Sequence, residues 1–305
     1  MIVVAGESLI DLVPQRAAVD GGPLPPLLPR LGGGPYNTAV ALARLGTPVT
    51  FCSRISTDGF GEALLGGLRA AGAGTSLVQR GPEPTTLAVA AIGAGGSAGY
   101  GFYAAGSADR LFELPPGLPA GVRALALGTC SLVLEPGASA YEALLRREAA
   151  RGVFTLLDPN IRPGLIADPD AYRARFDGWL PSVSLLKLSE DDAKWLGGSP
   201  EEWLAKGPAA VVLTRGERGL TVFTRDGVEA SVPAAAVTVA DTIGAGDTVN
   251  AALLHVLGRR DALSPGAVRA LDAAAWSTVL TFAARAAAVT CSRTGAEPPY
   301  ASELG

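Results

Sequence analysis

The segment Asp-Thr-Ile-Gly-Ala-Gly-Asp at residues 241–247 carries the residue types with the clearest chemical potential in this chain. A glycine-rich turn that leads into a helix presents free N–H groups and the positive end of the helix dipole, which suits a phosphate. Apolar residues at helical spacing follow the turn, so a helix is predicted over 245–257. Asp247 falls in its first turn, where an aspartate is often only an N-cap. A second acid, Asp241, six positions earlier favours an active-site role instead.

Three other segments bring polar groups to turns. Asp11 follows the first apolar segment, where its carboxylate could accept two hydroxyl protons or serve only as a turn residue. The triple glycine 32–34 precedes Asn37 and is consistent with a flexible turn or a hinge. The segment 158–165 ends a predicted strand, and ligands of open α/β sheets bind at such ends, so Arg162 is a candidate for a substrate or phosphate contact.

Bulk properties exclude several classes of partner. The net charge of −4 offers no sign of a nucleic-acid or membrane surface. No apolar run reaches the roughly 20 residues that a membrane span needs, and the N-terminal stretch is too short for a signal peptide. Cys52, Cys130, Cys291 and His255 lack metal-ligand spacing, so no zinc site is expected. Three reduced thiols are typical of a cytoplasmic protein.

Alternating apolar and amphipathic segments predict a parallel sheet covered by helices on both faces. The strands are expected at 1–6, 49–55, 123–127, 153–157, 183–187 and 210–214, with a hairpin at 219–231. The helices are expected at 36–45, 60–71, 138–151, 169–178, 190–196, 200–205, 245–257 and 265–287. Strand-like pieces within 12–30 and 85–103, the second pair joined by a glycine-rich turn at 93–99, break the alternation and predict a small β lid.

Two segments together resemble the signatures of the PfkB (ribokinase-like) carbohydrate kinase family. One is 241–247, and the other is Gly-Gly-Gly-Pro-Tyr-Asn-Thr-Ala at 32–39 followed by Gly46, about 200 residues earlier as in the family. The resemblance runs from residues 6–11 to 291–296, although Ser56 stands where the first signature normally ends in glycine. It implies one kinase domain over 1–305, with a three-layer α/β/α core, a mostly parallel sheet and lid segments at about 12–30 and 85–104.

The resemblance also implies roles for individual residues. Asp247 matches the base that deprotonates the sugar hydroxyl attacking the γ-phosphate of ATP, and the N–H groups of Gly244, Ala245 and Gly246 match the anion hole. The positions matching sugar contacts are Asp11, Gly32, Gly33, Asn37 and Arg162. Phe102 or Tyr103 either stacks on the sugar ring or belongs to the core of the lid.

Nucleotide and ion positions are implied in the same way. Those matching nucleotide contacts are Lys187, Ser189, Thr214, Gly216 and Gly219. Asp192 stands in place of a glutamate that reaches Mg²⁺ through water, so its reach is shorter. Asp241 and Ile243 match positions that hold a monovalent cation such as K⁺ in some members.

Local details resemble bacterial fructokinases, including the run Phe-Tyr-Ala-Ala-Gly-Ser-Ala-Asp-Arg at 102–110. Kinases of 2-keto-3-deoxygluconate often carry a basic residue after the aromatic pair, whereas Ala104 and Ala105 stand here. A neutral hexose is therefore favoured, and conversion of fructose to fructose 6-phosphate is the expected reaction. The alternatives are kinases of 2-keto-3-deoxygluconate, ribose or a nucleoside, or a non-catalytic sugar-binding relative. Exposed edges of the lid predict a homodimer.

Overall fold

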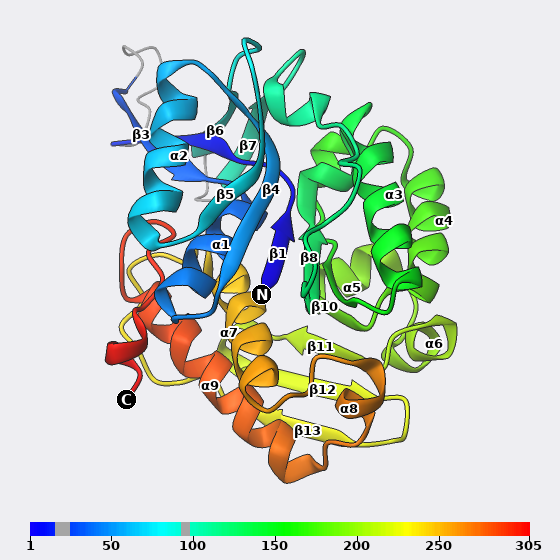
Figure 1. The fold of residues 1–305 in the computed structure, drawn as a ribbon. Helices are drawn as coiled ribbons and strands as arrows, with labels where there is room; N and C mark the ends of the chain where they lie inside the picture. Colours follow the sequence, from blue (N-terminus) through cyan, green and yellow to red (C-terminus); the bar gives the residue numbers. More distant parts are fainter. Residues whose placement is uncertain (16–24, 93–97) are drawn as a thin grey trace.

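A nine-stranded sheet forms the centre of the computed structural model, which describes residues 1–15, 25–92 and 98–305 (Figure 1). Seven strands run parallel, and β12 and β13 complete one edge as an antiparallel hairpin. The strands in spatial order are β13 (Glu229–Val232), β12 (Leu220–Thr224), β11 (Ala210–Thr214), β10 (Leu185–Ser189), β9 (Phe154–Asp158), β8 (Ala124–Gly128), β1 (Ile2–Ala5), β4 (Val49–Ser56) and β5 (Gly74–Gly81).

Helices cover both faces of this sheet, which confirms the predicted α/β/α layers (Figure 1). One face is covered by α1 (Gly34–Arg44), α2 (Gly59–Ala71), α7 (Ala245–Arg259), α8 (Pro265–Arg269) and α9 (Ala273–Cys291). The other face is covered by α3 (Gly137–Ala150), α4 (Pro169–Trp179), α5 (Glu190–Leu196) and α6 (Pro200–Lys206). Successive residues of a strand point to opposite faces of a sheet. In β1, Val4 accordingly packs in the hydrophobic core under α1 and α7, and Val3 packs in the core under α3 and α4.

A separate four-stranded sheet forms the lid, in the order β3 (Leu27–Gly32), β2 (Leu9–Pro14), β6 (Thr86–Ile92) and β7 (Ala98–Tyr103). It confirms the predicted lid, but its first segment starts at Leu9 rather than residue 12, because β2 follows β1 almost directly. The interval 16–24 and most of the predicted turn 93–99 lie outside the described residues.

One observed strand was not predicted, and one predicted helix is two helices in the structure. The strand β5 was not predicted, since it lies at the sheet edge beside β4 and its partly exposed side chains give little apolar signal. The single helix expected over 265–287 is broken into α8 and α9. Asp272 starts α9, and its side chain accepts a hydrogen bond from the Ala275 N–H. Alanine-rich flanks conceal this cap in the sequence.

The helix α9 is long and apolar enough to cross a membrane by length and composition alone, although the sequence was expected to hold no such run. Its Trp276, Val279 and Leu280 side chains are fully buried in the core with those of α7. A core helix of this kind meets the same criteria, so the helix is weak evidence for a membrane span.

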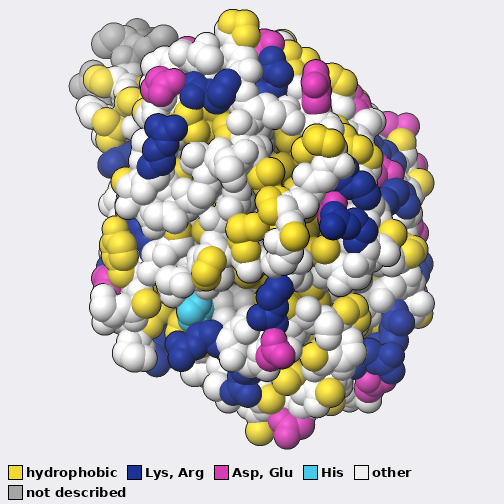
Figure 2. Space-filling view, viewed as in Figure 1, with side chains coloured by type: hydrophobic (Ala, Val, Ile, Leu, Met, Phe, Trp, Pro, Cys, Tyr) yellow, Lys and Arg dark blue, Asp and Glu magenta, His cyan; other side chains and the backbone are white. Residues whose placement is uncertain are grey.

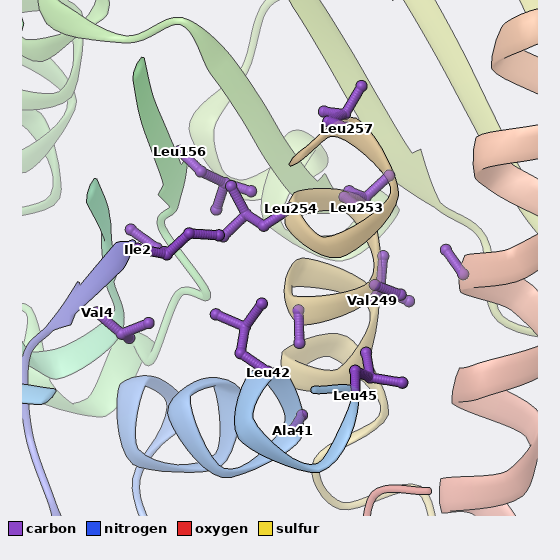
Figure 3. Packing of buried hydrophobic residues seen from close by; sticks show 14 of the residues in the cluster. Ile2, Val4, Ala41, Leu42, Leu45, Leu156, Val249, Leu253, Leu254 and Leu257 are labelled. Atoms are coloured by element: carbon purple, nitrogen blue, oxygen red, sulfur yellow. The ribbon is translucent and has the colours of Figure 1, made fainter. Parts of the chain in front are cut away.

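The packing of α1 against α7 holds the two segments with the strongest sequence signatures together. Figure 3 shows Leu254 of α7 pointing toward Ile2 and Leu156 of the sheet, with Leu42 of α1 close by. All four side chains are almost completely buried. The N-termini of both helices are therefore fixed relative to the carboxyl ends of the strands.

Asp58 links the start of α2 to Thr85, the residue that precedes the lid strand β6. Its carboxylate caps α2 through the Gly61 N–H at 2.7 Å and accepts from the backbone N–H and hydroxyl of Thr85. Ser56, where the signature residue is replaced, accepts from the Asp58 N–H. We expect Asp58→Ala to lower the free energy of unfolding by about 1–2 kcal/mol, as loss of a helix cap does. Urea unfolding measures the change, and Asp191→Ala on the exposed surface of α5 is the control; equal stability of both variants would contradict this role.

Candidate active site

A cavity of about 210 Å³ lies where the lid meets the carboxyl ends of β1, β8 and β9 and the N-terminus of α7. This is the edge of an open α/β sheet where ligands bind. Nine of the candidate site residues predicted from the sequence line it: Asp11, Gly33, Asn37, Phe102, Arg162, Ile243, Gly244, Gly246 and Asp247. Residues more than 200 positions apart in the chain thus form one site.

Asp247 lies at the bottom of the cavity with 7% of its surface exposed. Its Oδ2 accepts a hydrogen bond from Asn37 Nδ2 at 2.9 Å, which joins α7 to α1. Burial raises the pKa of Asp247 to about 7, while the Asn37 hydrogen bond opposes the rise. The Asp158 carboxylate raises this pKa further, and the charges of Lys187 and Arg162 lower it. A carboxylate with this pKa is suited to accept a proton near neutral pH.

The turn before Asp247 leaves the start of α7 open toward the cavity. Gly244 has φ 77°, and no side chain caps the helix there. A side chain at Gly244 would collide with Ala296, since an added Cβ would lie 2.6 Å from the Cβ of Ala296. The first N–H groups of a helix lack intrahelical partners, so an uncapped N-terminus can bind an anion. Ala245 begins the helix but does not itself line the cavity.

Asp11 and Arg162 are two further charged residues in the wall of this cavity. Burial raises the pKa of Asp11 to about 6, although the Arg162 guanidinium opposes that rise. Gly32 does not line the cavity, but an added Cβ there would lie 2.1 Å from Asp11 Oδ2. A glycine at position 32 therefore leaves room for the Asp11 carboxylate. Arg162 Nη1 donates to Asn160 Oδ1 at 2.7 Å, which holds the guanidinium near the cavity.

The two lid aromatics are placed differently. Phe102 lines the cavity, whereas Tyr103 is 69% exposed and is not part of the wall. Adjacent residues of a strand point to opposite faces, so only one of the pair can face the cavity. The sequence left open whether these aromatics stack on a sugar or belong to the core of the lid. Of the two, Phe102 is the one placed to contact a ligand in the cavity.

Several wall residues were missed by sequence reasoning, namely Glu7, Thr129, Asn160 and Thr242. Glu7 is buried and accepts hydrogen bonds from the Thr129 and Ser131 hydroxyls, and burial raises its pKa. A buried acid just after the first strand was a signal that could have been used. Asn160 adopts φ 39°, a left-handed conformation that asparagine tolerates better than most residues.

The nucleotide candidates lie in the neighbouring strands β10 and β11 and in the turn after β11. Lys187 is 4% exposed and pairs with Asp158 at 2.8 Å, and a Cβ on Gly246 would lie 3.0 Å from its Nζ. Its charge therefore lies directly beneath the α7 turn. Thr214 ends β11, and Gly216 and Gly219 in the following turn have φ 53° and 87°. These residues lie at the same edge of the sheet as the cavity.

The two candidate ion positions differ in how well they fit an ion. Asp192 accepts from the Ile161 N–H through Oδ1 and from both the backbone N–H and the hydroxyl of Ser189 through Oδ2, so it is largely committed to holding the start of α5. Asp241 accepts from the Ile243 and Gly295 N–H groups beside a cavity of about 240 Å³ that also touches Thr294. Its carboxylate retains free lone pairs, as binding of a monovalent cation would require. Within the described residues no three His, Cys, Asp or Glu side chains form a metal-binding group.

Known proteins share both this fold and this sequence pattern. The model of the pfkB family carbohydrate kinases matches residues 1–303. A fructokinase of Rhizobium leguminosarum bv. trifolii is 38% identical over 281 residues, which cover 89% of this chain and 84% of that protein. A fructokinase of Xylella fastidiosa with bound ATP has 28% identity and a TM-score of 0.88, covering 99% of this chain and 96% of that chain.

A fructokinase double mutant of Vibrio cholerae O395, solved with fructose, ADP and a potassium ion, has 26% identity and a TM-score of 0.79 over 97% of this chain and 93% of that one. These likenesses confirm the ribokinase-like fold. The chain belongs to the PfkB family of carbohydrate kinases. It is an ATP-dependent carbohydrate kinase that is similar in sequence to fructokinases.

Proposed function

We propose that this kinase transfers the γ-phosphoryl group of ATP to the 6-hydroxyl of fructose, with Asp247 as the general base. The observation that carries the proposal is the placement of Asp247, Asn37 and the uncapped start of α7 in one cavity with Asp11 and Arg162. The fructokinase relatives named above support the choice of sugar.

In this mechanism Asp11 accepts hydrogen bonds from sugar hydroxyls, and Asp247 takes the proton of the attacking hydroxyl. The N–H groups of Gly244, Ala245 and Gly246 and the Lys187 ammonium beneath them stabilise the charge on the transferring phosphoryl group. The Ala245 N–H donates to the Thr242 carbonyl at 3.3 Å in this structure, so it would exchange that partner for the phosphoryl group. Phe102 covers the sugar from the lid, which excludes water that would otherwise compete as the acceptor.

The charges of the cavity favour a neutral sugar. Three carboxyl groups, those of Glu7, Asp11 and Asp247, line it, and Arg162 is the guanidinium among the lining residues. A carboxylate on the substrate would meet more negative than positive charge at this wall, and an unpaired buried charge is costly. This arrangement supports fructose over 2-keto-3-deoxygluconate.

ATP, Mg²⁺ and K⁺ would bind next to the sugar cavity. ATP would lie beyond the α7 turn, along Lys187, Ser189, Thr214, Gly216 and Gly219. Asp192 would contact Mg²⁺ through a water molecule. The Asp241 carboxylate and the backbone of Ile243 would bind K⁺. When bound, Mg²⁺ would neutralise the β- and γ-phosphates. In this structure both Asp192 oxygens accept hydrogen bonds from Ile161 and Ser189, so Asp192 would reach Mg²⁺ only through water.

A coupled ADP-release assay across a sugar panel tests the proposed substrate. Fructose should give the highest kcat/KM among fructose, ribose, 2-keto-3-deoxygluconate and a nucleoside. A higher value for one of the other three would reassign the substrate within the family. Binding of sugar by calorimetry with no ADP release for any member of the panel would point to a non-catalytic sugar-binding protein.

The pH dependence of kcat/KM follows from the two cavity acids whose pKa values are raised, Asp247 and Asp11. Asp247 and Asp11 act in their ionised forms, and their pKa values are raised to about 7 and about 6. The value of kcat/KM should therefore rise with pH through this range and level off above about pH 8. A pH–rate profile measured with saturating ATP checks this, and a profile already flat at pH 5 would contradict it.

We further propose a single kinase domain, a cytoplasmic location and a homodimer that pairs through the lid. The strand β3 forms one edge of the lid sheet and exposes Leu27 and Leu31 at 41% and 36%. An exposed apolar edge strand favours pairing. On the face shown in Figure 2, basic and acidic side chains are interspersed among apolar ones. Sedimentation of the purified chain tests the dimer, and a monomer at micromolar concentration would contradict it.

A further inference from the structure

A buried polar network lies behind Asp247 on the side away from the sugar cavity. Asp158, at the end of β9, accepts hydrogen bonds at Oδ2 from Lys187 Nζ at 2.8 Å and from Asn250 Nδ2 at 2.7 Å. The three side chains are 2–4% exposed. Asn250 lies three residues after Asp247 in α7 and so shares its face of the helix.

Two oxygens of this network remain without a partner. Asp158 Oδ1 and Asn250 Oδ1 are buried and form no hydrogen bond with any residue that the structure describes. Both atoms are acceptors, and an unsatisfied buried acceptor costs free energy. The side chains that carry them line a small cavity of about 10 Å³ together with Asp247.

The cavity matches one water molecule. Its volume is that of a single ordered water, which needs two to four polar partners. A water has two O–H groups, and the cavity wall offers two unpartnered acceptors. A metal ion fits less well, because it needs more oxygen ligands and the rest of the wall includes the apolar side chains of Val4, Ala126 and Leu156.

We propose that this cavity binds one ordered water, which donates to Asp158 Oδ1 and Asn250 Oδ1, and that Asp158, through its contacts with Lys187 and Asn250, is a positioning residue for the catalytic base. The positioning role rests on the proposed function of Asp247, whereas the water site does not. Asp158 holds Lys187 and Asn250 in place, and through them it fixes the α7 turn that carries Asp247.

Asp158 also acts on the base through its charge. The groups that face Asp247 are Asn37 from α1, Asp158 from β9, Lys187 from β10 and Arg162 from the loop after β9. Among these, only the Asp158 charge raises the pKa of Asp247, while the other three lower it. Removal of that charge should therefore weaken the base and move its titration to lower pH.

The test compares two nearly isosteric variants. Asp158→Asn removes the charge, and Asn250→Leu removes the amide but keeps the Asp158 charge. We expect the acidic limb of the pH–rate profile to move down by about one pH unit in Asp158→Asn and not in Asn250→Leu. An unmoved limb in Asp158→Asn, or an equal shift in both variants, would overturn the positioning role.

The water is tested independently of activity. A crystal structure of the wild-type chain at a resolution that places ordered waters should show density within hydrogen-bond distance of both oxygens, and the density should be absent in Asn250→Leu. A wild-type map without this water would overturn the site. Wild-type-like turnover in Asp247→Asn would refute the proposed base while leaving the result for the water unaffected, so the two failures can be told apart.

Discussion

Asp247→Asn is expected to lower kcat by about 10³-fold while leaving the fold intact. General-base catalysis contributes about 10²–10⁴-fold, and this carboxylate lies in the first turn of α7 and lines the cavity. The amide of asparagine cannot accept the proton of the attacking hydroxyl, but its oxygen can still accept the hydrogen bond from Asn37. Turnover is measured by the coupled ADP-release assay with saturating fructose and ATP.

Two measurements separate loss of the base from loss of structure. The midpoint of thermal unfolding should stay at or above the wild-type value, because the substitution removes a buried charge. Fructose affinity measured by calorimetry should change little, since the base gains its main role only in the transition state. The proposal fails if Asp247→Asn turns over at a rate near that of the wild type, or if the variant is inactive only because it does not bind sugar.

The regular part of the fold could be predicted because its signal is local. Buried parallel strands such as β8 and β10 are continuous apolar segments, and amphipathic helices such as α3 follow or precede them. The edge strand β5 lacks that signal, since its stability comes from backbone pairing with β4. The break between α8 and α9 was hidden because it depends on a single capping side chain, Asp272.

The site was predictable where chemistry and backbone geometry coincide in a short segment. The turn 244–246 needs small residues for steric reasons, so its sequence signals its shape. The partners of Asp158 could not be predicted, because Lys187 and Asn250 reach it from elements 29 and 92 positions away. The raised pKa of Asp247 likewise depends on burial and on the charges of Asp158, Arg162 and Lys187 from two other segments, which no local pattern contains.

Asp11→Ala should have the second-largest effect, and that effect should fall on the sugar. The Asp11 carboxylate lines the same cavity as Arg162, and its two oxygens can accept hydrogen bonds from two sugar hydroxyls. A hydrogen bond to a charged group contributes about 1.5–3 kcal/mol, so the loss of two should lower kcat/KM for fructose by at least about 10²-fold. The assay is best run at pH 8, where a carboxyl with a pKa of about 6 is ionised.

The comparison with Asp11→Asn and Gly32→Ala separates hydrogen bonding from space. Asparagine keeps one acceptor and should recover part of the loss. An added methyl at position 32 would lie 2.1 Å from Asp11 Oδ2, so it should displace the carboxylate and raise KM for fructose although Asp11 itself is unchanged. In all three variants the KM for ATP should stay within about twofold of the wild type, because Asp11 lines the cavity whereas Lys187 and the other nucleotide candidates do not. Equal increases in both KM values would show that Asp11 supports the whole site rather than the sugar.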